Sequence, residues 1–450
     1  MAGKIRDMID TIIQQRAGGN PMLERIVKTK LILKGINPAR FTAQSEDDPT
    51  VIACLEQFLQ DLQGVPATQG APAAAVSSGA DGEYFHVACS TQADLAGCVA
   101  EISGRLQPCK PTMVLFFAAS RFAPEAVGRQ MQAAFPGAQV FGCTSAGEMV
   151  SGRMLDGGIV AMAFHRRAAG DVRVEVVEGL SNPHALHNAF ASFAKHYRTP
   201  VAAMDPDAYV GLVLVDGLRG AEEQLMETIG DLTDVTFIGG SAGDDLQFSA
   251  THVYANGRCY TDAAVLALMR PEIGFSFIKT QSFRPLEKSL RVTWADEARR
   301  EVLEFDDRPA AEAYADALGT SVEQAPDYFM RNPLGLIVEG EPFVRSPQQI
   351  KGGTMSFYCS IREGMELSLL ESGNIVEDTK TALEEAKRRM GSISAVVNFN
   401  CILRTLELKQ KQLTEDYGAL FSDIPMIGFS TYGEQYIGHI NQTATMLVFK

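Results

Sequence analysis

The stretch FPGAQVFGCTSAGE at residues 135–148 recurs without a gap, 286 residues later, as FSDIPMIGFSTYGE at residues 421–434. The two stretches share a phenylalanine, two glycines, a small hydroxyl residue and a final glutamate. An apolar run precedes each stretch, and another run, GGIVAMAF or TATMLVF, follows it. Self-similarity of this kind is typical of a duplicated domain.

A third stretch, VTFIGGSAGDD at residues 235–245, is one residue shorter and repeats the order strand, glycine, hydroxyl, glycine, acid. An arginine follows the strand that precedes each copy, at Arg121, Arg219 and Arg404. One interpretation is that the repeats only preserve turn geometry, with Gly142 and Gly428 in tight turns and the hydroxyl residues as caps. The other is that the loops gather at one crevice and bind a ligand.

Outward from these repeats, short apolar runs alternate with amphipathic segments, which is an α/β pattern. The buried strands are predicted at the runs TMVLFFAAS (112–120), YVGLVLVDG (209–217) and SISAVVNFNC (392–401). We expect an α/β protein with duplicated mixed-sheet domains layered with helices, at residues 84–280 and 285–450. Residues 1–63 carry helical apolar stripes and predict a small helical extension. Residues 64–83 are rich in Ala, Pro, Gly and Ser and predict a flexible linker.

The composition excludes several classes of protein. The chain has 450 residues, which is too long for one ordinary core. Its net charge of −15 argues against nucleic acid as a partner, and no apolar run is long enough for membrane insertion. The eight cysteines form no C-x-x-C pair, which is typical of reduced thiols in a cytosolic protein. We therefore expect a cytoplasmic protein.

The polar residues that gather after the buried strands predict a ligand-binding site. Glycine exposes backbone N–H groups, Ser and Thr add small donors, and arginine can pair with a carboxylate through two hydrogen bonds. The predicted ligand-binding residues are Thr144, Ser145, Ser241, Arg404, Ser430, Tyr432, Glu434 and His439.

Several segments resemble the FIST family of bacterial signal-transduction sensors. FGCTSAGE, FIGGSAGDD and HVYANGRCYTDAAVLALM are similar to the FIST N-terminal domain. RVTWADEARREVLEFDDRPAAEAYADALG, NFNCILR, IGFSTYGEQ and HINQT are similar to the FIST C-terminal domain. The resemblance spans about residues 84–450 and leaves the helical extension uncovered.

The resemblance implies a sensor that binds a small ligand such as an amino acid and lacks a catalytic constellation. Because the chain carries no kinase, cyclase or receiver segment, we expect the signal to pass to a separate partner, such as a histidine kinase or a cyclic-di-GMP enzyme. Residues 1–63 are the expected docking surface for that partner, although they could instead fold back on the main body.

The identity of the ligand and cofactor stays open between two candidates. A branch of the family is similar to haem-binding nitric oxide sensors, and this leaves haem b as a candidate cofactor. His439, beside the repeated loop, is then the candidate axial ligand, with the Cys401 thiolate as the alternative. The second candidate is an anionic metabolite held by Arg404 and backbone N–H groups.

Catalysis is the third hypothesis. Ser430, Glu434 and His439 lie close in sequence, but a nucleophile needs an adjacent base that is oriented by a third group. The chain has no phosphate-binding loop and no cluster with metal-ligand spacing. We therefore expect a protein that is not an enzyme.

Overall fold

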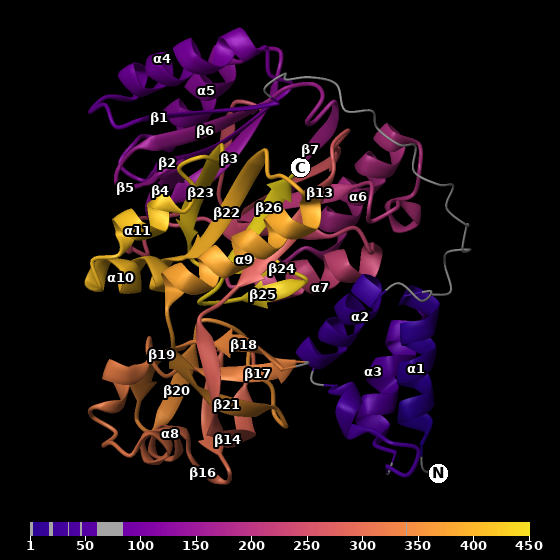
Figure 1. Ribbon diagram of the computed structural model, residues 1–450. Coiled ribbons are helices and arrows are strands. Elements are labelled where there is room, and N and C mark those ends of the chain that lie inside the picture. Colours follow the sequence, from indigo (N-terminus) through magenta and orange to yellow (C-terminus); the bar gives the residue numbers. More distant parts are fainter. Residues whose placement is uncertain (1–2, 18–20, 35, 46, 61–83, 339) are drawn as a thin grey trace.

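The computed structural model describes residues 3–17, 21–34, 36–45, 47–60, 84–338 and 340–450 (Figure 1). The predicted α/β class with mixed sheets is confirmed. The predicted linker at residues 64–83 lies outside the described residues.

The main body contains three copies of one structural unit, in which two strand–helix pairs precede a strand, a two-stranded hairpin and a last strand. The first copy comprises β1 (Phe85–Ser90), α4 (Leu95–Leu106), β2 (Met113–Ala119), α5 (Pro124–Ala134), β3 (Gln139–Ser145), β4 (Glu148–Val150), β5 (Arg153–Leu155) and β6 (Ile159–Phe164). The second comprises β7 (Asp171–Glu178), α6 (Pro183–Tyr197), β8 (Val210–Val215), α7 (Glu222–Leu232), β9 (Phe237–Ser241), β10 (Val253–Ala255), β11 (Arg258–Tyr260) and β12 (Ala263–Arg270). The third comprises β13 (Phe275–Thr280), α9 (Ile375–Met390), β22 (Ala395–Cys401), α10 (Ile402–Gln410), α11 (Thr414–Ala419), β23 (Met426–Thr431), β24 (Glu434–Tyr436), β25 (Gly438–Ile440) and β26 (Ala444–Phe449).

Each copy forms most of one six-stranded sheet and completes the sheet of another copy. The orders are β1-β6-β2-β3-β10-β11, β7-β12-β8-β9-β24-β25 and β13-β26-β22-β23-β4-β5. The last two strands of every sheet are therefore a hairpin from a different copy. The sequence predicted two halves and a third, shorter repeat at residues 235–245. The structure instead contains three equivalent units, and the exchanged hairpins join them in a ring.

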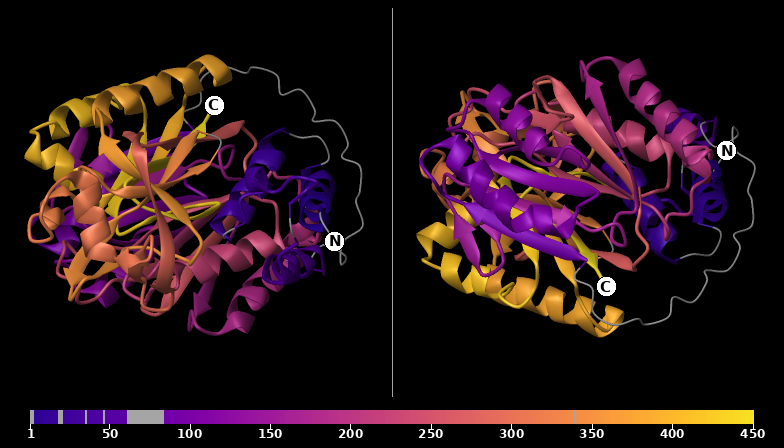
Figure 2. Two further views of the ribbon diagram at one scale, coloured as in Figure 1. Left: turned by 90° about the horizontal axis from the view of Figure 1, so that it is seen from below. Right: turned by 90° about the horizontal axis from the view of Figure 1, so that it is seen from above.

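One hydrophobic core lies between the three sheets, and the helices cover their outer faces (Figure 2). Phe117 of β2 contacts Phe429 of β23, with ring centroids 4.4 Å apart. α4 and α5 cover the first sheet, α6 and α7 the second, and α9 to α11 the third. Because both faces of each sheet are covered, strands such as β2 are apolar throughout their length.

The glycines shared by the repeats lie inside strands, so the interpretation that placed Gly142 and Gly428 in tight turns is wrong. Gly142 is in β3 and Gly428 is in β23. A Cβ atom would lie 2.0 Å from the Phe116 carbonyl oxygen at Gly142, and 2.3 Å from the Asn398 carbonyl oxygen at Gly428. Gly239 of β9 has the same relation to β8. Glycine therefore recurs because the neighbouring backbone occupies the space of a side chain.

A fourth sheet is inserted into the third copy, between β13 and α9. Its order is β18-β17-β21-β14-β15-β20-β19, with β16 paired to β15. Its elements are β14 (Phe283–Asp296), β15 (Glu301–Phe305), β16 (Arg308–Pro309), α8 (Ala310–Leu318), β17 (Leu334–Val338), β18 (Glu341–Arg345), β19 (Pro347–Lys351), β20 (Thr354–Phe357) and β21 (Glu366–Ser372).

The predicted helical extension consists of α1 (Lys4–Ala17), α2 (Pro21–Leu33) and α3 (Pro49–Gln60), which fold back beside α7 and the fourth sheet (Figure 1). Arg16 and Lys30 donate hydrogen bonds of 3.2 and 3.0 Å to the Gly230 carbonyl oxygen near the end of α7. Cations at a helix C-terminus are favourable because the helix dipole is negative there. Ile32 packs into the core of the fourth sheet, so α2 contacts two parts of the body.

Candidate functional site

Ser145, a predicted site residue, and Thr431, which the sequence analysis did not include, hold buried glutamates at equivalent positions. Ser145 Oγ donates to Glu148 Oε1, and the Gly158 N–H donates to Glu148 Oε2 over 2.8 Å. Thr431 Oγ1 donates to Glu434 Oε1 over 2.5 Å. Each glutamate begins a hairpin that pairs with another sheet, so these bonds fix the strand exchange.

The two glutamates share an electrostatic environment. Burial raises the pKa of Glu148 to about 7 and that of Glu434 to about 7, although the hydrogen bonds to each carboxyl group oppose the shift. Thr443 donates to Glu434 Oε2 from its hydroxyl over 2.7 Å and from its backbone N–H over 3.1 Å. Glu434 is therefore enclosed by protein donors.

The predicted hydroxyl residues Thr144, Ser241 and Ser430 are buried and occupy equivalent positions in the three copies. Thr144 Oγ1 accepts from the His252 N–H at 3.0 Å. Ser241 Oγ accepts from Gln435 Nε2 at 3.0 Å, and Ser430 Oγ lies 2.8 Å from Thr405 Oγ1. The structure thus distributes these hydroxyl groups over three strand junctions.

Arg404 and Tyr432 are also engaged with protein. Arg404 donates from Nε to Asn400 Oδ1 and from Nη2 to Thr379 Oγ1, both at 3.0 Å. Tyr432 donates its hydroxyl to Asp244 Oδ1 over 2.5 Å and accepts from the Leu246 N–H over 2.8 Å. That a ligand contacts all eight predicted residues stays a prediction.

Two predicted site residues line pockets between parts of the chain. Ser430 lines a pocket between the hairpin β4–β5 and α10, and His439 lines a second pocket, which more parts of the chain share. The pocket lies between α2, α7, the end of β18, the segment 360–365 and the hairpin β24–β25. Its lining residues are Lys30, Lys34, Glu223, Met226, Glu227, Gly230, Asp231, Arg345, Ser360, Arg362, Met365, Ile437, Gly438 and His439. The N-terminal helices, the second copy, the third copy and the fourth sheet therefore meet at one cavity.

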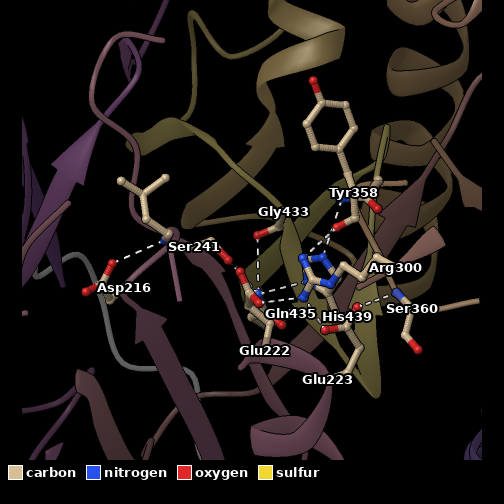
Figure 3. Close-up of polar contacts among 12 residues, drawn as sticks. Asp216, Glu222, Glu223, Ser241, Arg300, Tyr358, Ser360, Gly433, Gln435 and His439 are labelled. Carbon is tan, nitrogen blue, oxygen red and sulfur yellow. Dashed lines mark hydrogen bonds and ion pairs between the residues drawn. The ribbon is translucent and has the colours of Figure 1, made fainter. Parts of the chain in front are cut away.

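Both ring nitrogens of His439 face side-chain amides. Nδ1 lies 3.2 Å from Gln435 Nε2 (Figure 3). Nε2 lies 3.5 Å from Asn441 Nδ2. An imidazole always carries at least one N–H, so at least one amide has to present its oxygen to the ring instead. Gln435 Oε1 and Asn441 Oδ1 are buried without another hydrogen-bond partner among the described residues. These amides therefore set the orientation of the ring.

The carboxylates of the pocket are paired with cations. Arg300 Nη2 lies 2.5 Å from Glu223 Oε2, and the Ser360 N–H donates to Glu223 Oε1 over 2.7 Å (Figure 3). Burial raises the pKa of Glu223, but the charges of His439 and Arg300 outweigh it, so the pKa is lowered overall. The pocket therefore holds Glu223 as a carboxylate.

The remaining two carboxylates follow the same pattern. Arg362 Nη2 lies 3.0 Å from Glu227 Oε1, and Lys34 Nζ lies 3.4 Å from Asp231 Oδ1. Sequence reasoning missed these residues because the pairs join positions far apart in the chain. Arg345 was also missed, although an arginine at the end of the apolar run EPFVR is a signal that could have been noticed.

The surroundings of His439 do not fit a haem. Haem needs an axial ligand at the edge of a broad apolar cavity. The pocket is a cavity of about 40 Å³, and charged side chains make up half of its lining residues. A Cβ atom on Gly433 would lie 2.1 Å from His439 Cε1, so the ring also packs closely against the backbone. Burial raises the pKa of Cys401 well above its ordinary value, which disfavours a thiolate there.

A catalytic arrangement of Ser430, Glu434 and His439 is not formed. Ser430 contacts Thr405, Glu434 contacts Thr431 and Thr443, and His439 contacts Gln435 and Asn441. Within the described residues, no group of three or more His, Cys, Asp or Glu side chains could hold a metal ion. None of the described helices is both long and apolar enough to cross a membrane.

Comparison with known proteins identifies the family. The FIST N domain matches residues 112–308, and the FIST C domain matches residues 310–437. The chain belongs to the FIST family. The predicted family is thereby confirmed, and FIST domains are associated with signal-transduction sensing. The two FIST matches meet inside the fourth sheet, at β16.

Part of this chain is similar in sequence to a second protein. The uncharacterized protein MJ1623 of Methanocaldococcus jannaschii is 23% identical over 197 residues, which is 40% of this chain. The match covers 38% of the length of that relative.

Proposed function

We propose that this FIST protein is a sensor that binds a small ligand in the pocket beside His439 and passes the signal to a separate partner. The observation that supports the proposal is that one cavity is lined by α2, α7, the fourth sheet and the hairpin β24–β25. Ligand sites occur preferentially where parts of a protein meet, because a small ligand can then contact all of them.

The N-terminal helices supply the route for the signal. Lys30 of α2 and the adjoining Lys34 line the pocket, and they also contact the end of α7. A ligand that changes these contacts changes how firmly α1 to α3 are held against the body, because it binds the two arrangements with different affinities. The partner, a histidine kinase or a cyclic-di-GMP enzyme, then recognises the altered helices.

The hairpin β24–β25 connects the pocket to the body. Ile437, at its tip, has a φ of 64°, which is strained for a β-branched residue. The equivalent position in the second copy is Asn256, a residue that tolerates this conformation, with a φ of 54°. Ile437 lines the pocket together with Lys30 and Met226. Strained residues of this kind cluster at ligand sites, which supports a functional role for the hairpin tip.

Hydrogen exchange of the purified protein tests the proposal. Amino acids, dicarboxylates, phosphate and nucleotides are first screened by thermal shift, and each compound that raises Tm is then examined for exchange in α2 and α7. We expect a binding compound to change exchange in both helices. Lys34→Gln should weaken that response, whereas Lys409→Gln, which alters a Lys–Asp pair outside the pocket, should not. Compounds that change exchange only outside α2 and α7 would overturn the proposal.

A further inference from the structure

Arg345, at the end of β18, is a buried cation without a carboxylate partner. Its side chain lines the pocket, and the residue is 3% exposed. Among the described residues, the one hydrogen bond of the guanidinium runs from Nη1 to the carbonyl oxygen of the adjacent Val344, at 3.3 Å, and Nε has no partner. Removing a guanidinium from water without a counter-ion is strongly unfavourable. The residue is therefore suited to a partner that comes from outside the chain.

The acidic residues of the pocket do not fill this role. Glu223, Glu227 and Asp231 pair with Arg300, Arg362 and Lys34 respectively. Cys359 interacts electrostatically with Arg345. Burial raises the pKa of its thiol to about 11 and outweighs this attraction, which lowers the pKa. The thiol is therefore neutral at pH 7 and supplies no negative charge to Arg345.

We infer that the ligand of this pocket is a small anion whose carboxylate or phosphate group pairs with Arg345 and lies near His439. The inference rests on the proposed function and names its ligand class. The free Nε of Arg345 lies on the edge of the guanidinium that can form two parallel hydrogen bonds with such a group. Strand β18 packs against β25, which brings the end of the first strand near the hairpin that carries His439.

The size and charge of the pocket agree with an anionic head group. A cavity needs at least about 10 to 15 Å³ to hold one water molecule. The cavity of about 40 Å³ therefore accommodates a group of a few heavy atoms. Lys30, which is also buried in the lining, adds a second cation; burial lowers the pKa of its amine to about 8, with nearby Asp234 opposing the shift. An anion would be favoured by both side chains.

Anion binding to the full-length protein tests the inference. Tm is measured with sodium acetate, succinate or phosphate, with sodium chloride at equal ionic strength as the reference. We expect either the carboxylates or phosphate to raise Tm of the wild type. The anion that raises Tm shows whether the ligand carries a carboxylate or a phosphate group. Arg345→Lys should weaken binding about tenfold or more, because lysine lacks the planar fork. Arg345→Met should abolish the shift.

Two further measurements separate a binding role from a structural one. Without added anion, Arg345→Met should unfold at the same temperature as the wild type or at a higher one, since it removes a buried unpaired charge. Arg331→Met, which removes an exposed arginine outside this pocket, should keep the full anion shift. Equal anion shifts in wild type and Arg345→Met, or a lower Tm of Arg345→Met without anion, would refute the inference.

The outcome also distinguishes this inference from the proposed function. A neutral compound that changes exchange in α2 and α7 of both the wild type and Arg345→Met would support the sensor and refute the anion. An anion that binds through Arg345 without changing exchange in α2 or α7 would support the ligand class and overturn the signalling route.

Discussion

Glu148 and Glu434 are individual residues that link the stability of the protein to pH. Each is buried, and burial raises the pKa of each carboxyl group from 4.5 to about 7. The folded protein therefore binds protons more tightly at these sites than the unfolded chain does. The stabilising contribution is complete below about pH 4.5 and is lost as the pH rises through about 7.

Replacing Glu434 by glutamine should remove this contribution. The free energy of unfolding of Glu434→Gln minus that of the wild type should increase by about 3 kcal/mol between pH 4.5 and pH 8, because the variant never has to bury a negative charge. Urea unfolding at several pH values measures the difference. Glu385→Gln, at an exposed position of α9, serves as the control and should show a constant difference. A constant difference for Glu434→Gln as well would mean that its carboxyl group titrates normally.

At the scale of secondary-structure elements, the parallel pairs β2–β3, β8–β9 and β22–β23 each bring a glycine against the neighbouring backbone. The hairpin that follows the glycine-containing strand in each copy pairs with the sheet of another copy. The close approach of the strands thus accompanies the exchange that joins the three copies.

Gly428→Ala should destabilise the protein by about 3 kcal/mol or more, because the added methyl group overlaps the Asn398 carbonyl oxygen and the strands have to separate. Gly104→Ala is the matched control. Gly104 is in helix α4 with open space around it, so alanine should stabilise that helix by about 0.5 to 1 kcal/mol. Thermal unfolding compares the two variants, and similar effects of both would argue against a steric role for Gly428.

The contact between the N-terminal helices and α7 is a second element-scale feature. Asp234, just beyond α7, lies 3.7 Å from Arg16 Nη1 and 3.8 Å from Lys30 Nζ. Both cations have largely buried side chains, so the loss of their shared carboxylate leaves them without that compensation.

Asp234→Ala should weaken this docking by about 1 to 2 kcal/mol, a value reduced because Asp234 is itself partly exposed. Hydrogen exchange in α1 and α2 should speed up roughly tenfold while exchange in β2 and β22 stays unchanged, since about 1.4 kcal/mol corresponds to a factor of ten. Glu385→Ala, which removes an exposed pair with Arg388, should leave α1 and α2 unaffected. Unchanged exchange in Asp234→Ala would indicate that apolar packing alone holds the helices.

The whole molecule is a ring of three units, and strands from both sides of the boundary predicted at residues 280–285 share sheets. Hairpin β4–β5 belongs to the sheet of the third copy, and β24–β25 belongs to the sheet of the second. A cut between residues 280 and 285 therefore leaves the second and the third sheet each without its last two strands, and it also separates β13 from β26.

The fragment 84–280 should not fold by itself, because it lacks the hairpin that covers β9 and exposes the apolar inner faces of two sheets. Co-expression of residues 1–282 with residues 283–450 should restore a complex that co-purifies. Circular dichroism and size-exclusion chromatography of the fragment and the complex measure this. A monomeric fragment 84–280 that unfolds cooperatively would contradict the prediction.

The sequence by itself determined the α/β class, the helical extension, the family and the position of the repeats. These properties depend on local patterns: the period of apolar residues, the buried strand runs and the short motifs around Gly142 and Gly428. The sequence also indicated polar residues after the strands, and in the structure Ser145 and Thr431 occupy equivalent positions beside Glu148 and Glu434.

Only the tertiary structure decided where those residues lie and what surrounds them. The exchange of hairpins carries Glu434 and His439 into the sheet of another copy, and no local pattern records such pairing. The pocket beside His439 joins Lys30 to Arg345, which lie far apart in the chain. Long-range contacts of this kind depend on how apolar faces pack together, and a charge such as that of Arg345 can be recognised as unpaired only when all its neighbours are known.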